Sequence, residues 1–99
     1  MDVEYLKNEN SLTVKPKGRM DTNTSPILNE QAKTKMEDIT ELILDLENVP
    51  YVSSGGLRVI LEWDQIMEDR SGQFKMLHVN DNIKKVLDLT GLLSDITIE

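Results

Sequence analysis

The sequence predicts a single α/β domain in which helices pack on a mixed, mostly parallel β-sheet that begins with a hairpin. Three observations support this prediction. The chain has 99 residues, about the size of one domain. Short runs that are apolar or alternating, as in strands, are interspersed with longer segments of helical periodicity. Such an order, here β β α β α β α β over residues 1–99, is typical of parallel sheets with crossover helices.

The first two strands are expected to form a hairpin. Residues Val3–Lys7 alternate loosely, and Asn8-Glu9-Asn10 is a turn signal. Ser11–Lys17 then alternates again. Pro16 lies late in this second strand, which favours an edge or a strand end because proline cannot donate a ladder hydrogen bond.

The first helix is expected to begin at Thr24-Ser25-Pro26, with a hydroxyl residue as the N-cap and proline at the first helical position. Its apolar stripe has members spaced by four, four and three residues, namely Leu28, Ala32, Met36 and Ile39. We expect this helix to end near Glu37. The following run, Glu41–Leu46, is almost continuously apolar, which predicts a strand covered on both faces.

The second half of the chain repeats the alternation of helix and strand. The predicted elements are a helix from about Ser54 to Asp69, a strand from Phe74 to Val79, a helix capped by Asn80-Asp81 and ended by Thr90-Gly91, and a strand over Ile96–Ile98. No repeat, linker or low-complexity segment interrupts this order, so one domain accounts for the whole sequence.

Composition narrows the possible partners. With 11 Lys+Arg against 18 Asp+Glu, the net charge is −7, which repels both nucleic acid phosphates and anionic membrane surfaces. No apolar run approaches the roughly 20 residues that span a bilayer. The start, Met1-Asp2-Val3-Glu4, lacks the basic and apolar segments of a signal peptide. We therefore expect a cytoplasmic protein that binds other proteins, without nucleic acid or membrane.

The sequence holds no recognisable catalytic or metal-ligating constellation. There is no cysteine, and the one histidine, His78, falls in a predicted strand without a supporting motif. Gly55-Gly56 is too short for a phosphate-cradling loop. Asp45, at a strand end, could accept a phosphoryl group as in receiver domains, or its carboxylate could cap the amides of a nearby turn. We expect no cofactor and no metal.

Ser53 and Ser54 stand where a strand ends and a helix begins. One interpretation is capping, in which the Ser53 side chain accepts a hydrogen bond from the second or third helical N–H. The other is phosphorylation, because the unpaired amides and positive dipole end of a helix N-terminus tolerate a phosphate. The added charge of about −1.5 to −2 would then weaken the docking of a partner without unfolding the domain. The two interpretations are compatible, with one serine capping and the other exposed.

These motifs, in this order, resemble the STAS domain of the anti-sigma factor antagonist (anti-anti-sigma factor) family. The segment Gly18–Asp21 is similar to the family's glycine–basic–apolar–aspartate turn, and Leu42–Leu46 is similar to its central strand. Val49–Leu61 resembles its signature, an apolar residue, Asp or Ser, Ser, a small residue, then Gly-Leu. The resemblance covers nearly the whole chain.

The resemblance implies a function. Members of this family bind an anti-sigma factor that is also a serine kinase, and so release a sigma factor. The kinase phosphorylates the antagonist on a serine at the start of the second helix, which ends the binding, and a metal-dependent serine phosphatase restores it. The domain itself is not an enzyme. The alternative within the family is a non-switching subunit of a lipid-transport or stress-sensing complex.

The phosphorylated residue is assigned by alignment on Gly56-Leu57. Ser53 then stands where many members have Asp, Ser54 where they have the first Ser, and Gly55 where some carry the phosphorylated Ser. Because Ser53 is better placed to cap the helix, we expect phosphorylation on Ser54, with Ser53 as the alternative; a member that is never phosphorylated remains open. The expected partner-binding residues are Asp21, Ser53, Gly55, Gly56, Arg58 and Trp63.

Two of these residues have alternative structural roles. The second helix carries an apolar arc wider than a surface helix needs, so Trp63 is either an exposed anchor for a partner or packed under a neighbouring loop. Asp21 is expected near the phosphorylated serine, where it orients the hydroxyl or contacts the kinase. Alternatively, its side chain bonds its own backbone in a turn.

Overall fold

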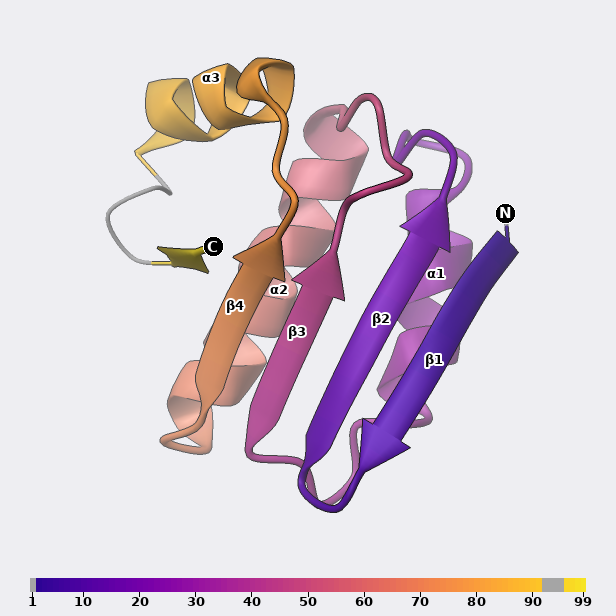
Figure 1. The fold of residues 1–99 in the computed structure, drawn as a ribbon, viewed down its shortest axis with the longest axis vertical. Coiled ribbons are helices and arrows are strands. Elements are labelled where there is room, and N and C mark those ends of the chain that lie inside the picture. The colour runs from indigo at the N-terminus through magenta and orange to yellow at the C-terminus, as the bar shows by residue number, and fades with distance from the viewer. Residues whose placement is uncertain (1, 92–95) are drawn as a thin grey trace.

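In the computed structural model, residues 2–91 and 96–99 are described, and they form one five-stranded sheet with three helices (Figure 1). The elements are β1 Asp2–Asn8, β2 Ser11–Lys17, α1 Ser25–Lys33, β3 Glu41–Asp45, α2 Ser54–Asp69, β4 Gln73–Leu77, α3 Asp81–Thr90 and β5 Thr97–Ile98. The predicted order of strands and helices is confirmed, and so is the mixed, mostly parallel sheet. None of the described helices is long and apolar enough to cross a bilayer.

The strands lie in the sheet in the order in which they occur in the sequence, from β1 to β5. β1 and β2 form the predicted antiparallel hairpin, paired without interruption from Asp2↔Lys17 to Asn8↔Ser11. The remaining neighbours are parallel. The carboxyl ends of β2, β3 and β4 therefore meet at one edge of the sheet, and the loops that follow them lie together.

Both α1 and α2 lie on the same face of the sheet, and the core fills the space between them and the strands (Figure 1). The buried strand positions alternate along the chain, as a half-covered sheet requires. The fully buried side chains that meet there include Leu12, Val14, Leu42, Leu44 and Met76 from the strands and Leu28, Ile60, Trp63 and Met67 from the helices. α3 lies beyond the carboxyl end of β4 (Figure 1).

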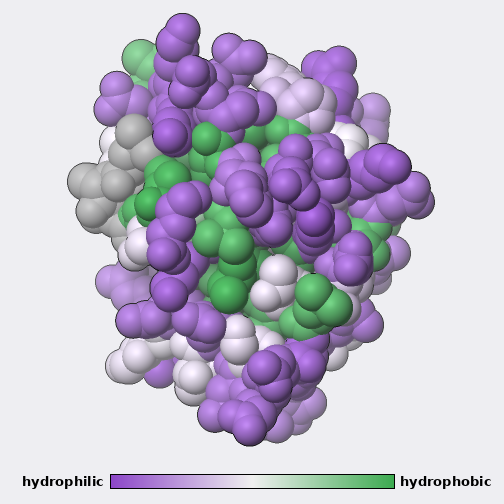
Figure 2. Space-filling model, viewed as in Figure 1, coloured by the Kyte–Doolittle hydropathy of each residue, from purple (hydrophilic) through white to green (hydrophobic). Residues whose placement is uncertain are grey.

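The prediction that Glu41–Leu46 is covered on both faces is wrong, because neither α1 nor α2 covers the second face. Figure 2 shows that face, where hydrophilic residues surround an apolar area in the middle. Charged side chains make this face compatible with solvent. Lys75 Nζ lies 3.4 Å from a Glu41 carboxylate oxygen and 3.7 Å from a Glu99 carboxylate oxygen. The long polar side chains thus shield Ile43, which is only partly buried.

Two predicted element boundaries differ from the structure. α1 ends at Lys33, not near Glu37. The apolar stripe continues through Met36 and Ile39, and both are buried, but they belong to turns after the helix. β4 ends at Leu77, since His78 takes the left-handed conformation with φ 55° that a strand cannot continue through.

The helix caps are partly as predicted. Asn80 caps α3 by accepting a hydrogen bond from the Ile83 amide at 2.9 Å, and Gly91 ends that helix with φ 79°. Thr24, in contrast, makes no side-chain cap on α1. Its hydroxyl instead donates to the Arg19 carbonyl at 2.6 Å, within the loop before the helix.

Candidate functional site

Two loops at the carboxyl edge of the sheet are joined by backbone hydrogen bonds. One follows β2, the other follows β3, and we call residues 18–24 and 51–58 together the α2 corner. The Met20 amide donates to the Tyr51 carbonyl at 3.1 Å, and the Ser53 amide donates back to the Met20 carbonyl at 2.8 Å. The segment that the family resemblance singled out before α1 therefore lies against the first turn of α2.

Two glycines allow this contact between the loop and the helix. A Cβ atom on Gly56 would lie 2.7 Å from both the Met20 carbonyl oxygen and a Val52 methyl carbon, distances that real Cβ atoms do not show. On Gly55 it would lie 3.0 Å from the Thr22 Cα. The expectation that Gly56 contacts a partner is wrong, because Gly56 is buried against its own chain.

Of the two serines, Ser53 caps α2 and Ser54 is exposed. Ser53 is the N-cap of α2: its hydroxyl accepts from the Gly55 amide at 3.2 Å, and its carbonyl accepts from the Leu57 amide at 2.9 Å. Ser54 is the first helical residue and is exposed, and within the described part of the chain its hydroxyl makes no hydrogen bond. A free hydroxyl thus stands at the positive end of a 16-residue helix.

Asp21 lies in the same corner, and its side chain bonds its own loop. One carboxylate oxygen accepts from the amides of Asn23 and Thr24, each at 2.9 Å, and from the Thr24 hydroxyl at 3.1 Å. Backbone hydrogen bonds from Thr24 and then Asn23 hold the pKa of the Asp21 carboxyl below its usual value. The turn-forming role is therefore confirmed, and Asp21 keeps a negative charge beside the helix.

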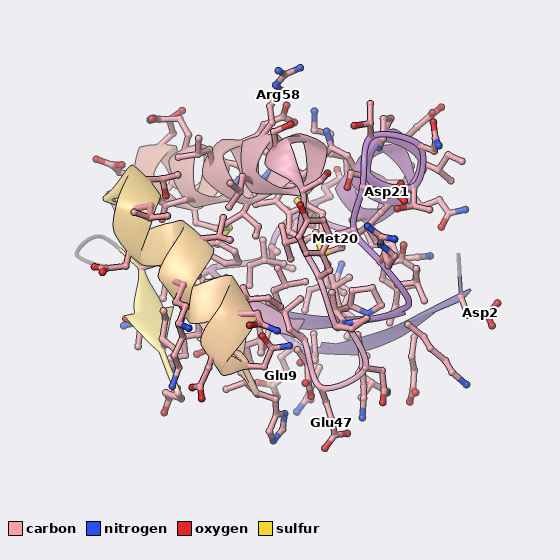
Figure 3. The ribbon with its side chains drawn as sticks, turned by 90° about the horizontal axis from the view of Figure 1, so that it is seen from above. Asp2, Glu9, Met20, Asp21, Glu47 and Arg58 are labelled. Atoms are coloured by element: carbon pink, nitrogen blue, oxygen red, sulfur yellow. The ribbon has the colours of Figure 1, made fainter. Side chains whose placement is uncertain are left out.

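The cationic side chains of the corner lie on its outer surface. Arg58 points away from the sheet on the outer side of α2, while Asp21 lies on the neighbouring loop and Met20 beneath it (Figure 3). Arg58 is exposed and lies one helical turn after Ser54. Arg19, which sequence reasoning did not single out, stacks over the ring of Tyr51 with its guanidinium carbon 5.0 Å from the ring centre.

Trp63 is not a surface anchor, and the expectation that it contacts a partner is wrong. Its side chain is 0% exposed, and its indole nitrogen donates to the Asn29 side-chain oxygen at 2.8 Å. The Asn29 amide nitrogen in turn donates to Glu62 at 3.1 Å, so the tryptophan fixes α2 against α1. The apolar residue that α2 does expose is Leu61, at 47%. Its position seven residues after Ser54 could have identified it from the sequence.

A second polar pair lies at the same edge of the sheet. Asp45, at the end of β3, accepts a hydrogen bond from the Glu47 amide at 3.0 Å, and its oxygen lies 2.8 Å from His78 Nδ1. The hydrogen bond and charge of Asp45 raise the pKa of His78. The turn-capping interpretation of Asp45 is thereby confirmed. Among residues 2–91 and 96–99, no three His, Cys, Asp or Glu side chains are placed to hold a metal ion.

Comparison with known proteins identifies the family of this chain. The family model of the STAS domain matches residues 2–99. The chain belongs to the STAS domain family. The chain is 28% identical over 98 residues to the anti-sigma-B factor antagonist of Bacillus subtilis, covering 99% of this chain and 90% of that protein.

Solved structures of other proteins share this fold. A structure described as a putative anti-sigma factor antagonist from Thermotoga maritima superposes with a TM-score of 0.89 at 18% identity, covering 97% of this chain and 84% of that one. The Bacillus cell fate determinant SpoIIAA in its phosphorylated form superposes with a TM-score of 0.78 at 16% identity, covering 99% and 91%. Identities this low establish the common fold alone.

Proposed function

We propose that this chain is a cytoplasmic anti-sigma factor antagonist, a binding protein without catalytic activity. In this proposal it binds an anti-sigma factor that is also a serine kinase and so frees a sigma factor. Phosphorylation of Ser54 ends the binding, and a metal-dependent serine phosphatase restores it. The names of the curated relatives support the antagonist role. The switch is inferred from the α2 corner.

The observation that carries the proposal is the division of roles between the two serines. Ser53 is only partly exposed, and its side-chain oxygen is held by the Gly55 amide as the cap of α2. Ser54 is exposed and uncommitted in the described structure, so a kinase can reach its hydroxyl without opening the fold. Ser54 is therefore the assigned phosphoacceptor.

Charge explains how a phosphate would act at this place. Two negative charges at the first residue of α2 are favourable for the helix itself, by about 0.3–1 kcal/mol for each interaction with the dipole. The same charges would add to those of Asp21 and of a chain whose net charge is already −7. The domain stays folded, while the added negative charge weakens the binding of a partner docked on this corner.

The proposed docking surface is the exposed part of the corner. Ser54, Arg58 and Leu61 follow one another at four and three residues along the outer side of α2, and all three are exposed. Tyr51, 43% exposed, extends this surface onto the neighbouring loop. Ser53 and Gly55, both partly buried, adjoin this surface in the chain, and Asp21 contributes its negative charge. An apolar residue flanked by an arginine and an aromatic ring is typical of a protein-binding surface.

The proposal is tested with the kinase and with charge variants. The purified chain is incubated with the cognate anti-sigma factor and ATP, and tandem mass spectrometry locates the phosphate. We expect phosphate on Ser54 in the wild type and none in Ser54→Ala. Phosphate on Ser53 or elsewhere would contradict the assignment.

Binding is measured in parallel, with a matched control for the added charge. Ser54→Ala should bind the anti-sigma factor as the wild type does, and Ser54→Asp should bind at least about tenfold more weakly. Ser71→Asp places the same charge at the other end of α2, on an exposed residue with φ 56° that aspartate accepts. It should bind normally; equal weakening by both aspartates would contradict a local switch at Ser54.

One observation favours a second candidate function, a STAS subunit that does not switch. Gly55 occupies the position where some family members carry the phosphorylated serine, and its backbone lies too close to Thr22 for a side chain to fit without a shift. Under this alternative the kinase experiment gives no phosphate on any serine, while the anti-sigma factor or another partner still binds.

A further inference from the structure

A second surface, the open edge of the sheet at β1, has the backbone geometry to pair with another strand. β1 lies at the margin of the sheet and pairs with β2 on one side only (Figure 1). Its seven residues contain no proline, and the continuous register with β2 leaves no bulge. Edge strands of this length in monomeric proteins are usually interrupted or covered, because their free amides and carbonyls are a template for another strand.

Pro16 fixes which backbone groups of β1 face outward. Residues opposite one another in an antiparallel pair alternate between exchanging two hydrogen bonds and exchanging none. Val3 lies opposite Pro16, which has no N–H to donate, so Val3 belongs to the pairs without bonds. By alternation, Val3, Tyr5 and Lys7 direct their amides and carbonyls to the open edge.

Apolar side chains flank this edge on both faces of the sheet. On the uncovered face, Leu6 is 57% exposed. On the helix side, Ile27 of α1 is 53% exposed and lines a groove with Tyr5. A strand added beside β1 would therefore bury apolar surface on both sides while satisfying the outward backbone groups.

We propose that β1 pairs antiparallel with β1 of a second copy of this chain, with Tyr5 opposite Tyr5, so that two five-stranded sheets join into one. This register overlaps the whole strand and forms three pairs from the outward residues, each exchanging two hydrogen bonds. The other facing pairs are Asp2–Asn8 and Glu4–Leu6, and Val3 faces Lys7. No like charges stand opposite one another.

The strand is complementary to itself, which is what a two-fold interface requires. A shift of two residues toward the amino terminus would place Glu4 opposite Glu4, so charge disfavours that register. Lys7 does not block the edge, because its ammonium group donates to the Glu37 carbonyl of its own chain at 3.1 Å. The other margin strand in the described structure, β5, has two residues and offers no comparable edge.

The mass in solution tests this proposal, since a dimer has twice the 11.3 kDa of the chain. Light scattering across a concentration series should show that mass, and Val3→Pro, which removes an outward amide, should be monomeric. Val3→Thr keeps the amide and is the matched control; it should remain dimeric. Circular dichroism checks that both variants are folded. A monomeric wild type, or a folded Val3→Pro that is still a dimer, would overturn the proposal.

Cross-linking tests the register. The chain has no cysteine, so a single introduced thiol reports one position. Tyr5→Cys should form an intermolecular disulfide under mild oxidation, because the facing Cα atoms would be about 5.5 Å apart, within disulfide range. Leu89→Cys, at a side chain that is 87% exposed on α3, is the control for disulfides formed by random collision of two chains. Cross-linking of Tyr5→Cys no faster than Leu89→Cys would exclude this interface.

Discussion

Replacing Gly56 by alanine tests whether the loop before α1 rests on the first turn of α2. The new Cβ atom would lie 2.7 Å from the Met20 carbonyl oxygen. That oxygen also accepts the Ser53 amide at 2.8 Å, and the Met20 amide donates to Tyr51 at 3.1 Å. Moving Met20 away from the new methyl group therefore loosens the hydrogen bonds that join the two loops.

The expected loss of stability is the balance of two opposing effects. Overpacking a close contact costs about 1–3 kcal/mol, and each weakened hydrogen bond costs about 1 kcal/mol. Alanine is a better helix former than glycine by about 0.5–1 kcal/mol, which offsets part of this cost. We expect a net destabilisation of about 1–3 kcal/mol. For a domain of this size each 1 kcal/mol lowers the Tm by about 4–8 °C.

Gly55→Ala is the matched control, because it adds the same methyl group one residue earlier. Its closest contact would be 3.0 Å, to the Cα of the exposed Thr22, which is looser than the 2.7 Å contacts at Gly56. Its unfolding free energy should therefore stay within about 1 kcal/mol of the wild type. Urea unfolding followed by fluorescence of the single tryptophan measures both variants. A Gly56→Ala variant as stable as the wild type would refute the contact between loop and helix.

Two further predictions concern the buried tryptophan and the histidine pair. Trp63→Ala should lower the free energy of unfolding by about 3–5 kcal/mol. Trp63→Phe should lower it less, because phenylalanine keeps an aromatic ring but leaves the Asn29 side-chain oxygen without its donor. An unchanged Tm in the alanine variant would mean that the side chain is exposed. His78 should titrate by NMR above its ordinary pKa, and Asp45→Asn should bring it back; the same pKa in both proteins would exclude the pair.

The sign of the pH dependence follows from the same pair. The raised pKa of His78 gives stability that is present below its unfolded pKa of about 6.5 and is lost as the pH rises through the folded value. Burial raises the pKa of Asp45, but the hydrogen bonds from His78 and the Glu47 amide outweigh it, so the net shift is downward. That contribution is present above about pH 4 and is lost as the pH falls through the lowered folded pKa. The pair should thus stabilise the domain most between about pH 4 and about pH 6.5.

Sequence patterns predicted the order of elements because each depends on local signals. The turn at Asn8-Glu9-Asn10, the cap at Asn80 and the left-handed Gly91 all lie where the residue types placed them. The end of α1 was wrong because burial and helical structure are different properties. Met36 and Ile39 continue the apolar spacing and are buried, but both lie in the turns that follow α1.

The α2 corner was predictable in position but not in its contacts. Spacing alone placed two hydroxyls at a helix start, and it favoured Ser53 as the cap. It could not show that Gly56 is held against Met20, since the two are distant in sequence. It also could not decide whether Trp63 faced solvent, because its partner, Asn29, lies on another helix. Tertiary contacts of this kind leave no periodic signal.

The most direct test of the proposed switch is the affinity of the anti-sigma factor for this chain before and after stoichiometric phosphorylation, measured by calorimetry on material whose modified residue is known. We predict that phosphate on Ser54 raises the Kd at least about tenfold while circular dichroism shows an intact fold. Equal affinities for the two forms, with the phosphate on Ser54, would contradict the proposed switch.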